Sequence, residues 1–336
     1  MSKTTSLFIL FLLSHSLSTS ILTASSSDIL YDINPFIRVY KNGTIQRFIG
    51  TDIVPPSIDA KTGVQSKDII INPQLNITAR LYVPKDANPS FKIPLLVYFH
   101  GDGFFTESAS SPSHHNHLNS VLAEANVVAV SVNYRLAPEY PLPIGYQDSW
   151  LALKWVFSCD EPWIKNYVAF GRVYVGGDSV GANIAHNMAV RVGLDETGGV
   201  LLNGLFLNCL HFWGKMPIGN EDSDSNIQVK NMMESIWIHA YPNLTGLDDP
   251  LLNPGLDPNL SRLGSKKVLV YVAGNDILNG RGWYYKEALS NSKWSGVVKI
   301  VQAQGEEHDF GVRFPNTPNA IELVKNFASF LNEGQV

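Results

Sequence analysis

The sequence predicts an α/β fold in which helices cover both faces of a mostly parallel sheet. Six short apolar runs alternate along the chain with segments of helical period. The runs lack the apolar–polar alternation of half-exposed strands, which is typical of strands buried on both faces. Apolar residues make up 45% of the 336 residues and charged residues only 16%. This balance allows a large core and excludes a disordered chain.

The expected elements begin with an antiparallel hairpin. Residues 68–71 and 77–83 have strand character, and the segment 72–76 between them, which contains Pro73, favours a turn. Further strands are expected at 95–99, 127–132, 173–176, 204–207, 268–273 and 297–301, and helices at 113–125, 145–158, 180–192, 228–241, 281–290 and 318–332. In parallel sheets ligands bind beyond the carboxyl ends of the strands, so functional residues are expected directly after these runs.

Residues 1–25 are predicted to form a secretory signal peptide. Lys3 precedes the apolar run 7–13, and a Ser/Thr-rich stretch follows. The run is shorter than the ~20 residues of a membrane span, so no stable membrane insertion is expected. Since the first acidic residue is Asp28, a plastid transit peptide is the alternative. Four N-glycosylation triplets favour a secreted glycoprotein, and they begin at Asn42, Asn76, Asn243 and Asn259.

Charge and metal-binding residue types point away from several functions. The net charge is −5 without a basic block, which argues against nucleic-acid binding. Two cysteines, Cys159 and Cys209, do not make a disulfide framework; Cys209 is expected in the core, and a single bridge between the two is the alternative. The cluster of His114, His115 and His117 is interpreted as a solvated helix start, because no Cys or H-E-x-x-H spacing joins it. We therefore expect no metal and no cofactor.

A candidate nucleophile lies between an expected strand and an expected helix. The sequence Gly177-Asp178-Ser179-Val180-Gly181 follows an apolar run and precedes residues of helical period. Glycines on both sides of Ser179 permit a sharp strand-to-helix turn that exposes the serine oxygen at the positive end of a helix. The alternative is a tight turn with a helix-capping serine.

A base and an orienting acid follow in the order that this turn requires. Asp276 comes directly after the run 268–273, and His308 lies in the loop after the next run, at 297–301. The order Ser, Asp, His matches a Ser-His-Asp triad, in which His308 moves the serine proton and Asp276 orients the imidazole. Taken alone, Asp276 also suits a helix N-cap and His308 a solvated loop.

A glycine-containing loop, His100-Gly101-Asp102-Gly103-Phe104, ends the first buried run and suits an oxyanion site. Here the chain resembles the plant carboxylesterase family, a branch of the hormone-sensitive-lipase-like α/β-hydrolases that includes the gibberellin receptor. The resemblance covers residues 30–332 and rests on the segments 100–104, 107–109, 133–139, 177–186, 248–250, 281–285 and 305–308.

The resemblance implies one α/β-hydrolase domain over residues 26–336 with a small helical cap from about 28–50 and 211–245. It also implies hydrolysis of a small-molecule carboxylic ester by Ser179, Asp276 and His308. The implied oxyanion donors are the N–H groups of Asp102, Gly103 and Val180. Four aromatic residues are candidates to line an apolar pocket, with ordinary core positions as the alternative: Phe104, Trp213, Trp237 and Tyr241.

Asp102 departs from the family's usual H-G-G-G loop. Its N–H remains, but a carboxylate that faced the site would repel a developing oxyanion; turned outward it would matter little, and burial would suppress its ionisation. This departure keeps open a second reading, a non-hydrolytic dehydratase or cyclase of specialised metabolism. Receptor function is disfavoured, because gibberellin-binding relatives lack the catalytic histidine that His308 supplies here.

Overall fold

The computed structural model describes residues 28–194 and 202–333, and the expected leader at residues 1–25 lies outside them. Eight strands form a central sheet in the order β11-β10-β9-β8-β6-β7-β5-β4. Only the pairs β4–β5 and β5–β7 are antiparallel. The strands are β4 (Gln65–Asn72), β5 (Ile77–Val83), β6 (Ile93–Phe99), β7 (Val128–Asn133), β8 (Val168–Asp178), β9 (Gly204–Asn208), β10 (Lys267–Ala273) and β11 (Val297–Ala303).

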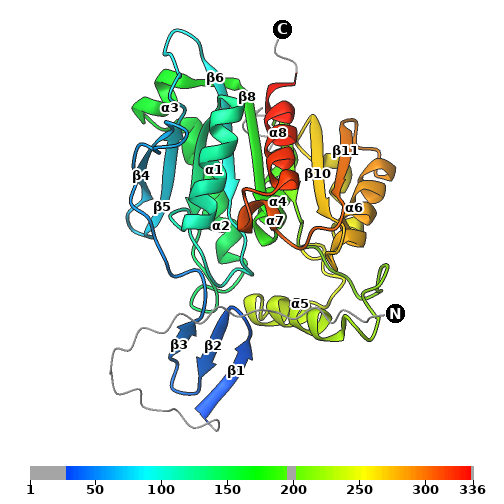
Figure 1. Cartoon of the computed structure of the whole chain (residues 1–336). Helices are drawn as coiled ribbons and strands as arrows, with labels where there is room; N and C mark the ends of the chain where they lie inside the picture. Colours follow the sequence, from blue (N-terminus) through cyan, green and yellow to red (C-terminus); the bar gives the residue numbers. More distant parts are fainter. Residues whose placement is uncertain (1–27, 195–201, 334–336) are drawn as a thin grey trace, which may run out of the picture.

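Helices cover both faces of this sheet (Figure 1). One face packs against α1, α7 and α8, and the other against α2, α4 and α6. A short helix, α3, precedes β8. The bounds are α1 (Pro112–Ala125), α2 (Ile144–Ser158), α3 (Pro162–Tyr167), α4 (Val180–Leu194), α6 (Asn279–Asn291), α7 (Phe310–Arg313) and α8 (Pro318–Asn332).

Strand β6 shows how the apolar runs build the core. Its side chains alternate between the two faces, so that Leu95 and Val97 join one buried cluster and Leu96 and Tyr98 the other. Every residue of β6 is buried. A strand covered on both sides has no solvent face for polar residues, which explains the uninterrupted apolar run.

A second, smaller sheet of antiparallel strands lies beyond the central sheet, next to α5 (Ile227–Ala240) (Figure 1). Its strands are β1 (Ile29–Ile33), β2 (Ile37–Tyr40) and β3 (Ile45–Arg47). The rings of Tyr31 in β1 and His239 in α5 lie 4.1 Å apart. The expected cap region 211–245 contains the helix α5, but residues 28–50, which were also expected in a helical cap, form strands instead. In β2 the buried Ile37 and Val39 alternate with the half-buried Arg38 and Tyr40, the pattern of a strand.

A buried ion pair ties the loop before α5 to the main domain. Arg281 in α6 binds Glu221 through two hydrogen bonds of 2.6 Å, and both side chains are buried. Arg281 also donates to the carbonyl oxygen of Met216 at 2.9 Å. Its guanidinium lies 5.0 Å from the ring centre of Trp213. This anchor fixes the chain on both sides of the loop at 214–221.

The predicted α/β class with a mostly parallel sheet is confirmed. The bounds of each predicted strand and helix lie within three residues of the observed ones except for the run 173–176, because β8 begins five residues earlier, at Val168. Cys209 is buried as predicted, and it and Cys159 are free thiols, so the alternative of a bridge is wrong. Within the described ranges, no helix combines the length and apolar character needed to span a bilayer.

Candidate active site

The serine lies on a strained turn between β8 and α4. Ser179 has φ of 52°, a left-handed conformation that non-glycine residues rarely adopt. A Cβ atom at Gly181 would approach the carbonyl oxygen of Phe99 to 2.0 Å, and one at Gly177 would lie 2.4 Å from the backbone of Gly181. The two glycines are therefore required by close backbone packing of the turn against the end of β6.

The three predicted triad side chains meet at the ends of neighbouring strands. His308 Nε2 lies 2.9 Å from Ser179 Oγ, and His308 Nδ1 lies 2.6 Å from Asp276 Oδ2. Burial alone would lower the pKa of His308, but the carboxylates of Asp276 and Asp309 raise it well above its ordinary value. Asp276 also accepts a hydrogen bond from the N–H of Leu278 at 3.0 Å, which fixes its carboxylate.

The loop after β6 presents backbone N–H groups beside the serine. Asp102, Gly103 and Phe104 all have positive φ, between 68° and 70°. Across the described chain, the N–H groups of Asp102 and Gly103 donate to no acceptor, and the N–H of Val180 opens α4. These free donors are what an oxyanion site requires.

The carboxylate of Asp102 is turned toward α7. Its Oδ1 accepts a hydrogen bond of 2.8 Å from Arg313. Burial raises the pKa of Asp102 to about 6, although Arg313 opposes this shift. The sequence left open whether this carboxylate faces the site, turns outward, or has its ionisation suppressed by burial. In the structure it pairs with Arg313, and burial also partly suppresses its ionisation.

A buried ion cluster lies under the turn and corrects one prediction. His114 was expected to be solvated at a helix start, but it is buried, with Nε2 at 3.2 Å from Asp178 and Nδ1 at 3.5 Å from Glu107. Although burial raises the pKa of both carboxyls, His114 dominates, so that both pKa values are lowered to about 2. Asp178 also accepts from the hydroxyl of Tyr98 at 2.7 Å.

The neighbouring histidines His115 and His117 are buried as well. Their burial could have been predicted from helical spacing. Positions 114 and 117 lie one turn before Leu118 and Val121, which both face the sheet. The ligand atoms of Asp102, Glu107 and His114 lie within 4.8 Å of one another. His114 carries the positive charge among these carboxylates, since their influence raises its pKa well above the ordinary value despite burial.

The candidate pocket aromatics separate into two groups. The rings of Phe104 and Trp237 meet edge to face at 5.3 Å, so that α5 touches the loop at residues 100–105 after β6, called the oxyanion loop below. Tyr241 follows α5 directly and is half-buried. Trp213 instead packs on Arg281.

Sequence reasoning missed His211. Its ring lies 5.5 Å from that of Trp237, and its backbone N–H donates to the carbonyl oxygen of Ser179 at 3.0 Å. His211 Nε2 and Trp237 Nε1 are buried without a hydrogen-bond partner among the described residues. His211 therefore connects α5 to the serine turn.

Strand β3 also contacts the oxyanion loop. Arg47 donates to the carbonyl oxygen of Phe105 at 2.7 Å and forms two hydrogen bonds with Glu139, at 2.9 Å and 2.7 Å. The N-terminal strands and α5 therefore both contact this loop.

Comparison with known proteins decides the family. A model of the alpha/beta hydrolase fold matches residues 96–312. The chain is 42% identical over 313 residues to probable carboxylesterase 2 of Arabidopsis thaliana, which covers 92% of this chain and 98% of the relative. The chain belongs to the plant carboxylesterase family. Another member, 2-hydroxyisoflavanone dehydratase of Glycyrrhiza echinata, is 44% identical over 329 residues and covers 94% of this chain and 100% of the relative.

Solved esterases share the fold of this carboxylesterase-family chain. A hyperthermophilic esterase of the archaeon Pyrobaculum calidifontis superposes with a TM-score of 0.69 at 26% identity, over 81% of this chain and 86% of that chain. A thermostable carboxylesterase cloned from a metagenomic library gives a TM-score of 0.69 at 25% identity, over 84% and 91%. The relatives thus include proteins named as probable carboxylesterases and a protein named as a dehydratase.

Proposed function

We propose that this protein is a serine carboxylesterase that hydrolyses small, partly apolar carboxylic esters through an acyl-enzyme. The observation that carries the proposal is the continuous hydrogen-bonded chain from Ser179 through His308 to Asp276, with distances of 2.9 Å and 2.6 Å. A serine, an imidazole and a buried carboxylate at these distances form the arrangement that activates an oxygen nucleophile.

Proton transfer through His308 drives both halves of the proposed reaction. Nδ1–H donates to Asp276, so Nε2 accepts the hydroxyl proton as Ser179 attacks the ester carbonyl. The imidazolium then gives this proton to the departing alkoxide, which leaves as an alcohol. Water repeats the sequence on the acyl-enzyme and releases the acid.

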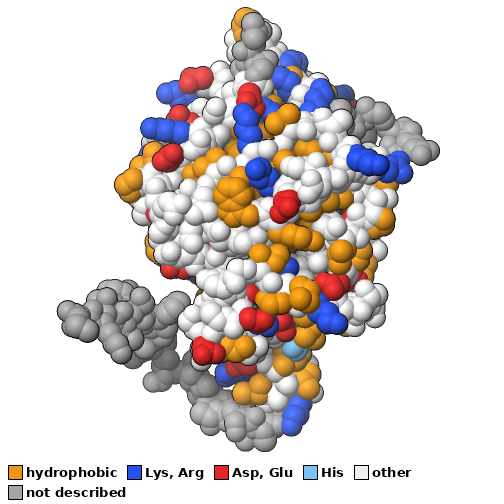
Figure 2. Space-filling view, turned by 90° about the vertical axis from the view of Figure 1, so that its right-hand side faces the viewer, with side chains coloured by type: hydrophobic (Ala, Val, Ile, Leu, Met, Phe, Trp, Pro, Cys, Tyr) orange, Lys and Arg blue, Asp and Glu red, His pale blue; other side chains and the backbone are white. Residues whose placement is uncertain are grey.

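The developing oxyanion is stabilised by the free N–H groups of Asp102, Gly103 and Val180. The ion pair with Arg313 compensates the negative charge of Asp102, which reduces its repulsion of the oxyanion. Charged side chains of both signs are interspersed on the face that Figure 2 shows, and hydrophobic side chains lie between them. This mixed surface suits a small neutral substrate better than a polyanion.

Dehydration is the second candidate, and two observations favour it. A relative at 44% identity is named as a dehydratase. In addition, a carboxyl group stands in the oxyanion loop, at Asp102. In this reading His308 removes a proton from a carbon of a hydroxylated substrate and gives it to the departing hydroxyl group, which leaves as water while a C=C bond forms, and no acyl-enzyme is made.

Turnover of short p-nitrophenyl esters by the wild type and by Ser179→Ala tests the proposal. We expect Ser179→Ala to lower kcat by about 10⁴-fold or more, because no other hydroxyl replaces the nucleophile. Mass spectrometry after a brief reaction should show the acyl group on the wild type and none on the variant. Ester turnover that survives in Ser179→Ala would contradict an acyl-enzyme and favour the dehydratase.

A further inference from the structure

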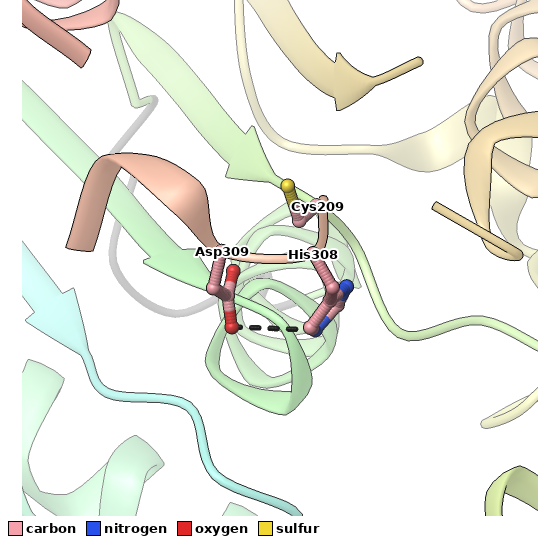
Figure 3. A group of neighbouring side chains, drawn as sticks. All are labelled: Cys209, His308 and Asp309. Carbon is pink, nitrogen blue, oxygen red and sulfur yellow. Dashed lines mark ion pairs between the residues drawn. The ribbon is translucent and has the colours of Figure 1, made fainter. Parts of the chain in front are cut away.

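A second carboxylate contacts the nitrogen of His308 that serves the serine. Asp309 Oδ2 lies 3.2 Å from Nε2, the same atom that lies 2.9 Å from Ser179 Oγ. Figure 3 shows the two side chains of His308 and Asp309 directed toward each other from consecutive residues before α7. The triad accounts for the contact of Asp276 with Nδ1, but it does not account for this one.

An ordinary structural role does not explain Asp309. It occupies the N-cap position of α7, yet its side chain forms no capping hydrogen bond. Its φ is 53°, and its Oδ1 is buried without a partner among the described residues. A buried carboxylate in a disfavoured backbone conformation is costly unless a specific partner compensates it.

The surrounding charges leave His308 as that partner. Asp178 pairs with His114, and Asp102 pairs with Arg313. The ion pair with His308 is the one that Asp309 forms within the described chain. Arg313 also acts on Asp309 and opposes the rise of its pKa, although its hydrogen bond goes to Asp102. The remaining groups that face Asp309 and His308 are Asp276, the hydroxyl of Tyr98, the thiol of Cys209 and the imidazole of His211.

Apart from Arg313, which already pairs with Asp102, none of these groups supplies a positive charge to Asp309. Burial lowers the pKa of His211 to about 3, and burial raises that of the Cys209 thiol well above its ordinary value, so both are neutral. The ligand atoms of Cys209, His308 and Asp309 lie within 4.8 Å of one another. Both imidazole nitrogens of His308 are already engaged in the triad, so the group lacks a free imidazole ligand for a metal ion.

We propose that Asp309 is a positioning residue that retains a proton between its Oδ2 and His308 Nε2, and thereby sets the pH above which the serine is activated. With the proton on Nε2, the imidazolium forms the ion pair with the carboxylate; with the proton on Oδ2, the carboxyl group lies against Nε2 and competes with the hydroxyl of Ser179 for it. In both arrangements Nε2 cannot accept the proton of Ser179, so activation requires that this shared proton leaves to solvent. The inference rests on the proposed function in so far as it assigns His308 the role of base.

Two substitutions remove the carboxylate and suit the backbone. Asn and Gly both tolerate the left-handed conformation at position 309. We expect Asp309→Asn and Asp309→Gly to lower the titration midpoint of His308 by about one pH unit or more, because an adjacent opposite charge raises a histidine pKa by about 1–3 units. Glu307→Gln is the matched control, since it removes an exposed acid directly before His308 whose side chain forms no hydrogen bond or ion pair with the imidazole within the described chain.

Two readouts separate this inference from the proposed function. The first is the NMR titration of the His308 imidazole in histidine-labelled protein, assigned with His308→Gln. The second is the acid limb of kcat/KM for p-nitrophenyl acetate, which should move by the same amount. A lowered NMR midpoint without ester turnover in the wild type supports the inference and refutes the esterase. Ester turnover with an unmoved midpoint in both variants refutes the inference alone.

The wild type provides a test that needs no variant to fold. We expect the His308 midpoint in the wild type to lie above the ~6.5 of an ordinary histidine. A midpoint at or below that value, or an equal shift in Glu307→Gln, would overturn the role of Asp309.

Discussion

Replacing Arg313 with glutamine should destabilise the protein at alkaline but not at acidic pH. Arg313 lies 2.8 Å from the buried carboxylate of Asp102, whose pKa burial raises to about 6. Below pH 6 the carboxyl is protonated in both proteins, so Arg313→Gln removes no ion pair. Above pH 6 the carboxyl of the wild type is ionised, and the variant lacks the cation that compensates it.

The size of the effect follows from the burial of the two partners. Removing the partner of a fully buried charge costs about 3–5 kcal/mol of unfolding free energy. The side chain of Arg313 is 43% exposed, so solvent already screens the pair. We therefore expect about 1–2 kcal/mol. For a chain of this length that corresponds to a Tm lower by about 1–3 °C.

The sign of the pH dependence follows from linkage. A carboxyl whose pKa is raised by folding weakens the fold as pH rises through that pKa, and the loss is larger when its counter-ion is absent. Scanning calorimetry at about pH 5 and pH 8 should show a Tm difference between wild type and Arg313→Gln only at the higher pH. In an Asp102→Asn background the same substitution should have little effect at either pH. Equal destabilisation at both pH values, or full additivity with Asp102→Asn, would refute the reasoning.

Two further substitutions test the strained turn at Ser179 and the ion pair that anchors the loop before α5. Gly181→Ala should abolish soluble folded protein or lower Tm sharply, because its Cβ would lie 2.0 Å from a backbone oxygen of Phe99. Gly171→Ala is the control, because open space surrounds its Cβ, and it should leave Tm unchanged. Thermal unfolding that shows equal losses of Tm in the two variants would contradict this packing argument. Arg281→Met should cost about 3–5 kcal/mol in urea unfolding by leaving Glu221 buried and unpaired, and adding Glu221→Gln should recover most of it. No recovery in the double variant would show that the ion pair is not the cause.

Local pattern was sufficient for most of the fold. The apolar runs lack polar residues because strands such as β6 are covered on both faces, and their length identifies them as strands. The strands at residues 29–47 were missed because each has only 3 to 5 residues, so their alternation is too short to detect. Strands this short depend on tertiary partners such as α5.

Some residues of the candidate site could be predicted from the sequence and others could not, for physical reasons. Ser179, Asp276 and His308 each follow a strand of the parallel sheet, and such a sheet brings its carboxyl ends to one edge, so sequence order implied proximity. Asp309 and Arg313 could not be assigned in this way. Their partners depend on side-chain directions in a left-handed turn and a short helix, which residue type and spacing do not determine.

The hydrogen bond from Arg47 to Phe105 has a consequence for engineering within this family. Exchanging the N-terminal strands between relatives is an attractive route to chimaeras with new substrate preferences, because these strands rest beside the reaction centre. Here the same segment holds the backbone of the loop that carries the proposed oxyanion donors. A graft that omits Arg47, or its acceptor pair at Glu139, would change rate and selectivity together. Such chimaeras should be built with both partners transferred as one unit.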